Sequence, residues 1–297
     1  MDSIDPEIYS KKNNIHYLFA MESIKQLNID NRSYDLIVDL GCGDGGITKH
    51  LFGKHLPHKR LIGIDVVDDM ISYARNHNMD DTIEYVMQDM SIGWPEIASP
   101  RVRQLDGTVD LLISNFALQY MPDKCQVMNT CSRLLSSTTT TTTTNTGGIF
   151  HANIAILPDL NKKLVTTKGP PKQWYPTIDK QIADWKQSII ANQLDIKQLM
   201  TIDYDWTIDR QTMIDFMPVI QSNYRSFFKN QSDFEAELND HLSDTLFDAF
   251  VNPTAPDPKP KAWQQFIADT TVTEVVVHFI TIRVTAIKQQ QKNKLIN

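Results

Sequence analysis

Cysteine is scarce in this chain, and the few cysteines present form no recognisable framework. Cys42, Cys125 and Cys131 are the only three among 297 residues. Their number is odd, no two of them form a C-x-x-C pair, and none lies near a histidine cluster. The sequence therefore argues against a disulfide scaffold and against a zinc site or other metal centre. A reducing compartment, the cytoplasm, fits this usage best.

The sequence also lacks segments for membrane insertion or export, and it lacks a basic bias. No apolar run reaches the length of a transmembrane helix. The N-terminal MDSIDPEIYS is more polar and acidic than a signal peptide. The net charge is −7, whereas binding to nucleic acid needs a clustered basic surface. We therefore expect a cytoplasmic monomer or homodimer that acts on a small molecule, with no nucleic-acid or membrane partner.

Short apolar runs alternate with helical patterns in the first half of the chain. Buried strands are predicted over residues 35–40, 61–66, 83–88, 109–114 and 148–157. Helices are predicted within the first thirty residues and over residues 46–52, 68–76 and 124–135. This alternation implies right-handed crossovers and a parallel sheet covered on both faces, so the predicted fold class is α/β.

The second half is richer in helical patterns. Helices are predicted over residues 179–191, 210–222 and 232–250, an alternating strand over 199–207, and a β-branched strand within 271–287. Residues 136–146 are almost pure threonine and predict a disordered surface loop. Residues 252–261 contain four prolines and predict a second loop.

A glycine-rich loop, GCGDGG at residues 41–46, follows the first predicted strand and opens a helix. Its spacing also fits the G-x-G-x-x-G fingerprint of dinucleotide sites, so the glycines alone leave the nucleotide open. Asp39 lies two residues before Gly41. A carboxylate there disfavours the pyrophosphate that a dinucleotide loop places at a helix N-terminus. It suits a ligand that carries a cationic sulfonium and an ammonium group.

Two further acidic residues follow the next two strands. Asp65 ends the second predicted strand, where a carboxylate can bind both ribose hydroxyls. Asp89 ends the third, where it can accept a hydrogen bond from the exocyclic amino group of adenine. Each of these acidic residues is common on its own, and helix capping or solvation of a strand end is the alternative explanation. Three acidic residues in this order predict a site for S-adenosylmethionine.

Residues 35–135 resemble the class I methyltransferase core through the segments VDLGCGDGG, LIGIDVVDDMISYAR, VMQDM and VDLLISNFALQYMPD. The resemblance implies a Rossmann-like α/β fold with a seven-stranded, mostly parallel sheet of order 3-2-1-4-5-7-6, whose seventh strand is antiparallel. It implies S-adenosylmethionine as cofactor. The implied contacts are Asp39, Gly41 and Gly43 with the methionine portion, Asp65 with the ribose, Val66 and Met70 with the adenine face, Asp89 and the Met90 backbone with the adenine edge, and Asn115 on the sulfonium side.

The resemblance extends over nearly the whole chain to the arthropod juvenile hormone acid methyltransferases, which methylate the carboxylate of farnesoic acid or its epoxide. The similar segments are IYSKKNN at 8–14, SNFALQY at 114–120, KQWYP at 172–176 and VVVHFITIRVTAIK at 275–288. That family holds the substrate carboxylate with a Gln in the N-terminal helix and a Trp after strand four. Here His16 and Tyr120 occupy those places, and both can donate a hydrogen bond. The resemblance makes them the candidate catalytic residues and leaves the identity of the acid open.

We divide the chain on this basis into four parts. They are an N-terminal helical segment at 1–30, a cofactor-binding core at 31–160, a helical acceptor lid at 161–270 with one core strand near 198–207, and a final core strand at 271–288. Aromatic residues could line an apolar acceptor pocket, although most of those in the lid could equally pack its core. The candidate substrate-binding residues are Tyr9, His16, Tyr120, Trp174, Phe216 and Tyr224.

The sequence leaves three functions open. The first is methylation of a small hydrophobic carboxylic acid, which is ionised at pH 7 and needs no general base. The second is methylation of a polar polycarboxylate such as trans-aconitate, which would need cationic lid residues; Lys172, Arg210 and Arg225 are available. The third is a non-catalytic protein that binds a ligand.

Overall fold

The computed structural model of the chain describes residues 14–27, 32–137, 147–158, 177–222, 231–237, 242–251 and 261–289. These residues belong to two compact units. Unit 1 draws on Met1–Ile154, Asp184–Thr201 and Ile282–Asn297, and unit 2 on Ala155–Ala183 and Ile202–Thr281. No helix in the described ranges has the length and apolar character needed to cross a membrane.

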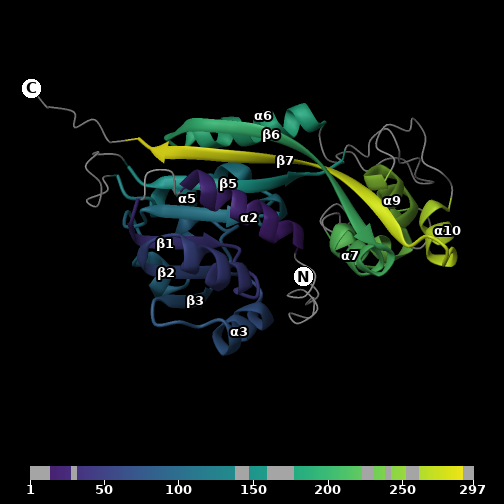
Figure 1. The fold of residues 1–297 in the computed structure, drawn as a ribbon. Coiled ribbons are helices and arrows are strands. Elements are labelled where there is room, and N and C mark those ends of the chain that lie inside the picture. Colours follow the sequence, from purple (N-terminus) through teal and green to yellow (C-terminus); the bar gives the residue numbers. More distant parts are fainter. Residues whose placement is uncertain are drawn as a thin grey trace, which may run out of the picture. The chain divides into compact units, whose positions relative to one another are not determined.

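A seven-stranded sheet has the order β3-β2-β1-β4-β5-β7-β6 (Figure 1). The strands are β1 (Tyr34–Leu40), β2 (His58–Asp65), β3 (Ile83–Met87), β4 (Leu111–Asn115), β5 (Ile149–Ile156), β6 (Leu194–Asp209) and β7 (Glu274–Lys288). β1 pairs in parallel with β2 and β4, β2 with β3, and β4 with β5. The predicted Rossmann-like α/β fold and its strand order are confirmed.

β7 runs antiparallel to β5. The backbone N–H of Lys288 donates to the carbonyl of Gly148 at 2.9 Å, and Nε of Arg283 donates to Oδ1 of Asn153 at 2.7 Å. Since the residue numbers fall along β7 as they rise along β5, the two strands point in opposite directions. This is the direction that the family resemblance implies for the last strand.

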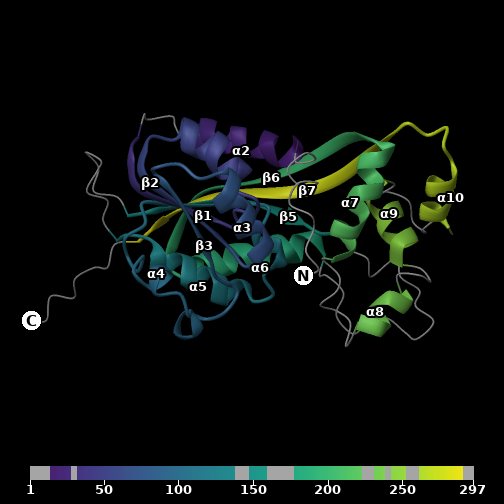
Figure 2. The same ribbon diagram turned by 90° about the horizontal axis from the view of Figure 1, so that it is seen from below.

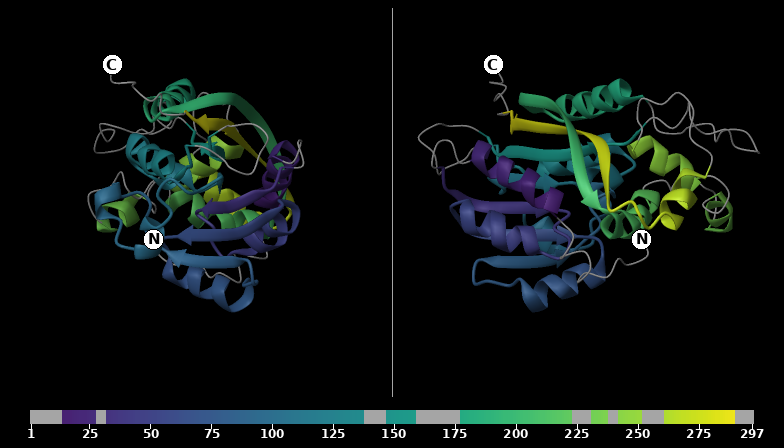
Figure 3. Two further views of the ribbon diagram at one scale, coloured as in Figure 1. Left: turned by 90° about the vertical axis from the view of Figure 1, so that its left-hand side faces the viewer. Right: turned by 45° about the vertical axis from the view of Figure 1, so that its right-hand side comes forward.

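Helices cover the sheet of unit 1 on both faces, as the continuous apolar strands require. α2 (Asn14–Leu27) lies on one face and α5 (Lys124–Leu134) on the other (Figure 2, Figure 3). The further helical elements of the described chain are η1 (Thr48–Gly53), α3 (Asp68–His77), η2 (Trp94–Glu96), α4 (Pro100–Arg103), η3 (Leu118–Tyr120) and α6 (Ile178–Ala191). The helix predicted over 46–52 contains the π-helical turn η1.

Unit 2 has its own hydrophobic core. It is built by α7 (Arg210–Ser222), α9 (Ser243–Val251), α10 (Ala262–Ala268) and α8 (Gln231–Glu237), together with parts of β6 and β7. Met213, Met217 and Leu246 are buried at its centre. The helix predicted over 232–250 is described in two parts, α8 up to Glu237 and α9 from Ser243, and residues 238–241 between them lie outside the described residues. α10 has no counterpart in the prediction, because one short amphipathic stretch beside a proline-rich segment gives a weak periodic signal.

The predicted disordered loop begins too early. Ser136 is buried, its N–H donates to Val109 O at 2.9 Å, and its carbonyl accepts from Gly148 N at 2.7 Å. Ser136 is therefore part of the ordered connection between α5 and β5. Its backbone hydrogen bonds hold it there, although its place beside the threonine tract predicted a disordered loop. The rest of the threonine tract, at 138–146, and most of the proline-rich segment lie outside the described residues.

A side chain at a turn can destabilise the fold through backbone strain or through a clash with its neighbours. Gly41 and Gly107 distinguish these two effects. Both have positive φ, 78° and 67°. A Cβ on Gly41 would lie 2.1 Å from Cβ of Ala117, whereas a Cβ on Gly107 would meet nothing within 4 Å.

We predict that Gly107→Ala lowers the free energy of unfolding by about 1 kcal/mol, the backbone penalty alone. Gly41→Ala adds the overpacking of Ala117 and should lose about 1–3 kcal/mol more. Urea unfolding of both variants measures the difference. Equal losses would contradict the assignment of Gly41 to a close contact.

Candidate active site

The glycine-rich loop lies across the carboxyl ends of β1 and β2. Gly41 N and Cys42 N both donate to the carbonyl of Ile64, at 2.7 and 3.1 Å. Gly43 N donates to Oδ2 of Asp65 at 2.9 Å. The loop is thus fastened to β2 by its own backbone, at the edge where ligands bind in parallel α/β sheets.

Asp39, on β1 just before this loop, has a buried carboxyl group. Its side chain is 3% exposed, and its Oδ2 accepts a hydrogen bond from Oγ1 of Thr48 at 2.6 Å. Burial raises the pKa of Asp39 to about 7; the Thr48 hydrogen bond opposes the shift, and the nearby Asp65 adds to it. A carboxylate kept from water beside a second one is a site that favours a cation.

Asp44 and Tyr17 join the loop, although the sequence did not single them out. Oδ1 of Asp44 accepts from Gly46 N at 3.0 Å, and the Asp44 carbonyl accepts from Nδ2 of Asn78 at 2.8 Å. A Cβ on Gly46 would lie 3.4 Å from the Tyr17 hydroxyl. Burial is the main cause that raises the pKa of Tyr17, and the negative charge of Asp44 raises it further. α2 therefore reaches the loop. Asp44 stands inside the motif and could have been found, but no pattern in one sequence places Tyr17 there.

Asp65 is held at the end of β2 by backbone donors. Gly43 N bonds one carboxylate oxygen, and Val67 N bonds the other at 3.0 Å. Burial raises the pKa of Asp65, and these backbone bonds oppose the shift. The carboxylate is fixed in place with lone pairs left to accept from a diol.

Exposed apolar side chains flank this carboxylate. Val66 is 49% exposed, and Met87, which pairs with Asp65 in register on β3, is 48% exposed. Met70 is 6% exposed in α3. Val66 and Met87 therefore offer more surface to a flat base than Met70 does, and Met87 was missed because its position reads as the buried end of a strand.

Asp89 follows β3 in a tight turn. Its Oδ1 accepts from Ser91 N at 2.8 Å and from Ser91 Oγ at 2.7 Å, and its carbonyl accepts from Gln88 Nε2 at 2.9 Å. Met90 is buried. The turn holds the carboxylate at the same edge of the sheet as Asp39 and Asp65.

The beginning of α2 lies beside the end of β4. The His16 ring stacks on Phe116 with centroids 4.9 Å apart and an interplanar angle of 22°. Burial lowers the pKa of His16 to about 4, so that its ring is neutral at pH 7. Tyr120, 36% exposed, ends η3 four residues after Phe116. The structure therefore brings His16 to the segment that carries Tyr120.

Asn115 is engaged by the protein on both sides of its amide. Its Nδ2 donates to the backbone carbonyl of His16 at 3.0 Å, and its Oδ1 accepts from Nδ2 of Asn153 at 2.9 Å. The side chain thus joins β4 to α2 and β5. A role for Asn115 toward a cofactor stays a prediction.

The other predicted acceptor residues do not gather in the described chain. Tyr9, Trp174 and Tyr224 lie outside the described residues. Phe216 lies on α7 in unit 2, where its ring packs edge-on against Trp206 at 5.6 Å between centroids. Its observed contact is one of core packing.

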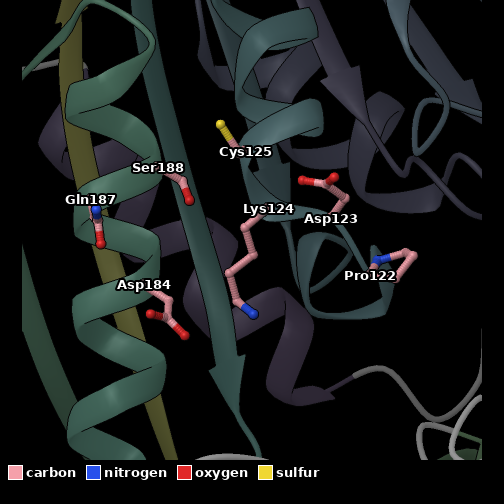
Figure 4. A pocket seen from close by; sticks show the side chains of 7 residues that line it. All are labelled: Pro122, Asp123, Lys124, Cys125, Asp184, Gln187 and Ser188. Carbon is pink, nitrogen blue, oxygen red and sulfur yellow. The ribbon is translucent and has the colours of Figure 1, made fainter.

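A cavity of about 430 Å³ opens elsewhere in unit 1, between the start of α5 and α6 (Figure 4). It is lined by Pro122, Asp123, Lys124, Cys125, Asp184, Gln187 and Ser188. None of these residues belongs to the loop or the strand ends described above, so the cavity is distinct from the candidate cofactor site. Among the described residues, no group of three or more His, Cys, Asp or Glu side chains is arranged to hold a metal ion.

The raised pKa of Asp39 gives a stability prediction. The pKa of Asp39 is near 7 in the folded state, whereas its ordinary value is 3.8. The contribution of Asp39 to the free energy of unfolding is therefore fully present below pH 4 and is lost as the pH rises through 7. Asp39→Asn should therefore gain stability over wild type between pH 4 and 7, with a constant gain above. Thermal unfolding of the ligand-free proteins from pH 4 to 8 tests this. A difference that does not change with pH would contradict it.

Parts of this chain are similar in sequence to known proteins. Residues 31–207 match the family profile described as methyltransferase domain. The chain is 30% identical over 114 residues to the malonyl-[acyl-carrier protein] O-methyltransferase of Acetivibrio thermocellus, covering 38% of this chain and 36% of that protein. It is 32% identical over 118 residues to a trans-aconitate 2-methyltransferase of Escherichia coli, covering 40% and 41%. The matches thus span less than half the length of either relative.

The fold has solved counterparts as well. The crystal structure of the YcgJ protein from Bacillus subtilis has a TM-score of 0.51 and 15% identity, and the alignment covers 92% of this chain and 99% of that one. At this identity the likeness concerns the fold alone. The family profile, in contrast, covers more than half of the chain and includes Asp39, Asp65 and Asp89. The chain therefore belongs to the methyltransferase domain family, and its domain is of the class I, S-adenosylmethionine-dependent type.

Proposed function

We propose that this protein transfers a methyl group from S-adenosylmethionine to the carboxylate of a small hydrophobic acid, such as farnesoic acid or juvenile hormone acid. The resemblance to the juvenile hormone acid methyltransferases supports the choice of acid. The names of two relatives, one for O-methylation of a malonyl group and one for methylation of trans-aconitate, support acids as a class. The observation that carries the proposal is the stacking of His16 on Phe116 beside the end of β4.

The residues at the strand ends fit the cofactor part by part. Asp39 would face the ammonium-bearing methionine portion together with the backbone of Gly41 and Gly43. Asp65 would accept from the ribose hydroxyls. The adenine would lie against Val66, Met70 and the exposed Met87, with its edge toward Asp89 and Met90. Each carboxylate is already held by protein donors, so little reorganisation is needed on binding.

The acceptor side fits a group that arrives ionised. The cofactor supplies a methyl group activated by a positively charged sulfur. A carboxylate oxygen forms the new C–O bond as the C–S bond breaks, so the two charges are neutralised and no proton has to move. A histidine with a pKa of about 4 is a poor general base at pH 7, but its neutral ring can donate a hydrogen bond. His16 and Tyr120 would therefore orient the carboxylate in line with the methyl group.

The acceptor pocket itself is assigned to the lid at 161–270 as part of this proposal. A polar polycarboxylate would require free cations there. The Arg210 guanidinium lies 5.8 Å from the Phe266 ring centroid and donates to the Ile267 carbonyl, so the core of unit 2 engages it. Lys172 and Arg225 lie outside the described residues. The contacts of Arg210 remove one of the three candidate cations, which supports a hydrophobic acid over a trans-aconitate-like one, and a non-catalytic binding protein is the third alternative.

Calorimetric titration with S-adenosylhomocysteine tests the cofactor half. We predict that affinity rises between pH 6 and 8, because the ammonium group of the ligand favours ionised Asp39, whose pKa is about 7 in the free protein. At pH 8, Asp39→Asn should weaken binding at least tenfold, about 1.4 kcal/mol.

Asp35→Asn is the matched control, since Asp35 lies on the same strand and pairs with Lys59 at the surface. The control should bind as wild type does. Equal affinities for Asp39→Asn and wild type at pH 8 would refute the role of Asp39.

A transfer assay with S-adenosylmethionine labelled in its methyl group tests the acceptor half. We predict labelled methyl esters with farnesoic acid and juvenile hormone acid, because the site orients a carboxylate and supplies no strong base. His16→Ala should raise the KM for the acid on the order of tenfold, through the loss of one positioning hydrogen bond. Label in trans-aconitate alone would overturn the hydrophobic acid, and label in none of the acids would overturn carboxyl methylation.

A further inference from the structure

A buried polar cluster lies between α2 and the sheet of unit 1, and the proposed chemistry does not use it. Asn153 on β5, Arg283 on β7 and Ser23 on α2 are 1%, 3% and 0% exposed. Buried polar groups of this kind are retained only when they are well bonded. Their bonds define what they hold.

Asn153 faces α2 and β4 at once. Its Nδ2 donates to Oγ of Ser23 at 2.9 Å and to Oδ1 of Asn115 at 2.9 Å, and it lies 3.4 Å from the carbonyl of Phe19. Asn115 in turn donates to the carbonyl of His16 at 3.0 Å. Two strand amides thus bond the backbone of the first turns of α2, close to the residue proposed to hold the acceptor.

Arg283 fixes the direction of this relay. Its Nε donates to Oδ1 of Asn153 at 2.7 Å, which leaves Nδ2 as the atom that faces α2 and Asn115. A guanidinium NH2 lies 2.9 Å from Oε2 of Glu22, and the guanidinium carbon lies 5.4 Å from the Phe19 ring centroid. The guanidinium therefore contacts α2 directly and through Asn153.

The energetics favour positioning over stability as the role of this arginine. Taking a guanidinium out of water is expensive, so a buried ion pair is weak evidence for a role in stability. What an apolar residue cannot do is orient the Asn153 amide, for which the fixed, planar donors of arginine are suited.

We infer that Arg283 is a positioning residue for methyl transfer. Through Asn153 and Asn115 it holds the first turns of α2 on β4 and β5. That placement keeps His16 against the segment after β4 and Tyr17 beside the glycine-rich loop. The inference rests on the proposed function for its catalytic consequence, and it concerns the described residues of unit 1 alone.

Arg283→Met in the full chain tests it, because methionine keeps much of the volume and removes the donors. The matched control is Arg133→Met. Arg133 also pairs with a carboxylate, Asp106, and lies over an aromatic ring, that of Trp94 at 4.7 Å, but it has no bond to α2 within the described chain. Hydrogen exchange of the α2 amides, kcat and acceptor KM with farnesoic acid, and S-adenosylhomocysteine affinity are measured for each variant.

We expect Arg283→Met to raise the acceptor KM and lower kcat, each on the order of tenfold, because a small misplacement of a positioning group has effects of this size. Exchange of the α2 amides should accelerate by a similar factor, while Arg133→Met leaves exchange and both kinetic constants at wild-type values. Arg283→Lys, which keeps the charge but loses the planar fork, should rescue only part of the loss.

Unchanged α2 exchange and an unchanged KM in Arg283→Met would overturn the inference. If that variant does not fold, Arg283→Lys takes its place, since lysine keeps the charge and loses the planar fork that bonds Asn153. Faster α2 exchange in Arg283→Lys would support the inference, and wild-type exchange would refute it. A wild-type protein that binds no S-adenosylhomocysteine would instead refute the proposed function, while the exchange comparison would still decide whether Arg283 holds α2.

Discussion

The buried carboxylate of Asp39 is the constraint around which the cofactor end of the sheet is organised. It lies next to the last residue of the central strand β1, where burial raises its pKa to about 7 and the hydroxyl of Thr48 donates a hydrogen bond to it. Thr48 begins the π-helical turn, a local widening that often marks functional positions. A carboxylate held in this way is unfavourable in the empty protein, and a cationic ligand turns the same burial into selectivity.

The proposed acceptor end of the site depends on a different feature, the packing of α2 against the end of β4. Phe116 has a φ of 58°, a left-handed conformation that costs a non-glycine residue about 1–3 kcal/mol. His16 stacks on its ring, and Phe19 meets it edge-on at 5.0 Å. The side-chain amides of Asn115 and Asn153 donate hydrogen bonds to the same helix, α2. Aromatic contacts with Phe116 and polar contacts with Asn115 and Asn153 therefore hold α2 beside the end of β4.

The acidic strand ends could be predicted from local patterns in the sequence, whereas the sheet order followed from the resemblance to the class I methyltransferase core. Continuous apolar runs mark buried parallel strands, and Asp39, Asp65 and Asp89 follow them at fixed places. The sequence did not predict that a side chain at position 41 would clash with Ala117, 76 positions away, or that Tyr17 lies close to Asp44. Nor did it indicate that Asn115 bonds α2 and Asn153. Those facts depend on contacts between distant segments, which no periodicity reports, and the acceptor residues Tyr9, Trp174 and Tyr224 stay predictions.

The central claim is that burial tunes Asp39 for a cationic ligand. Carbon-13 NMR of the aspartate carboxyl groups over a pH titration tests it most directly, with Asp39→Asn to assign the signal. The account predicts that Asp39 titrates near pH 7 in the free protein and well below that value when S-adenosylhomocysteine is bound. A signal that titrates near pH 4 in the free protein, or one that the ligand leaves unmoved, would contradict it.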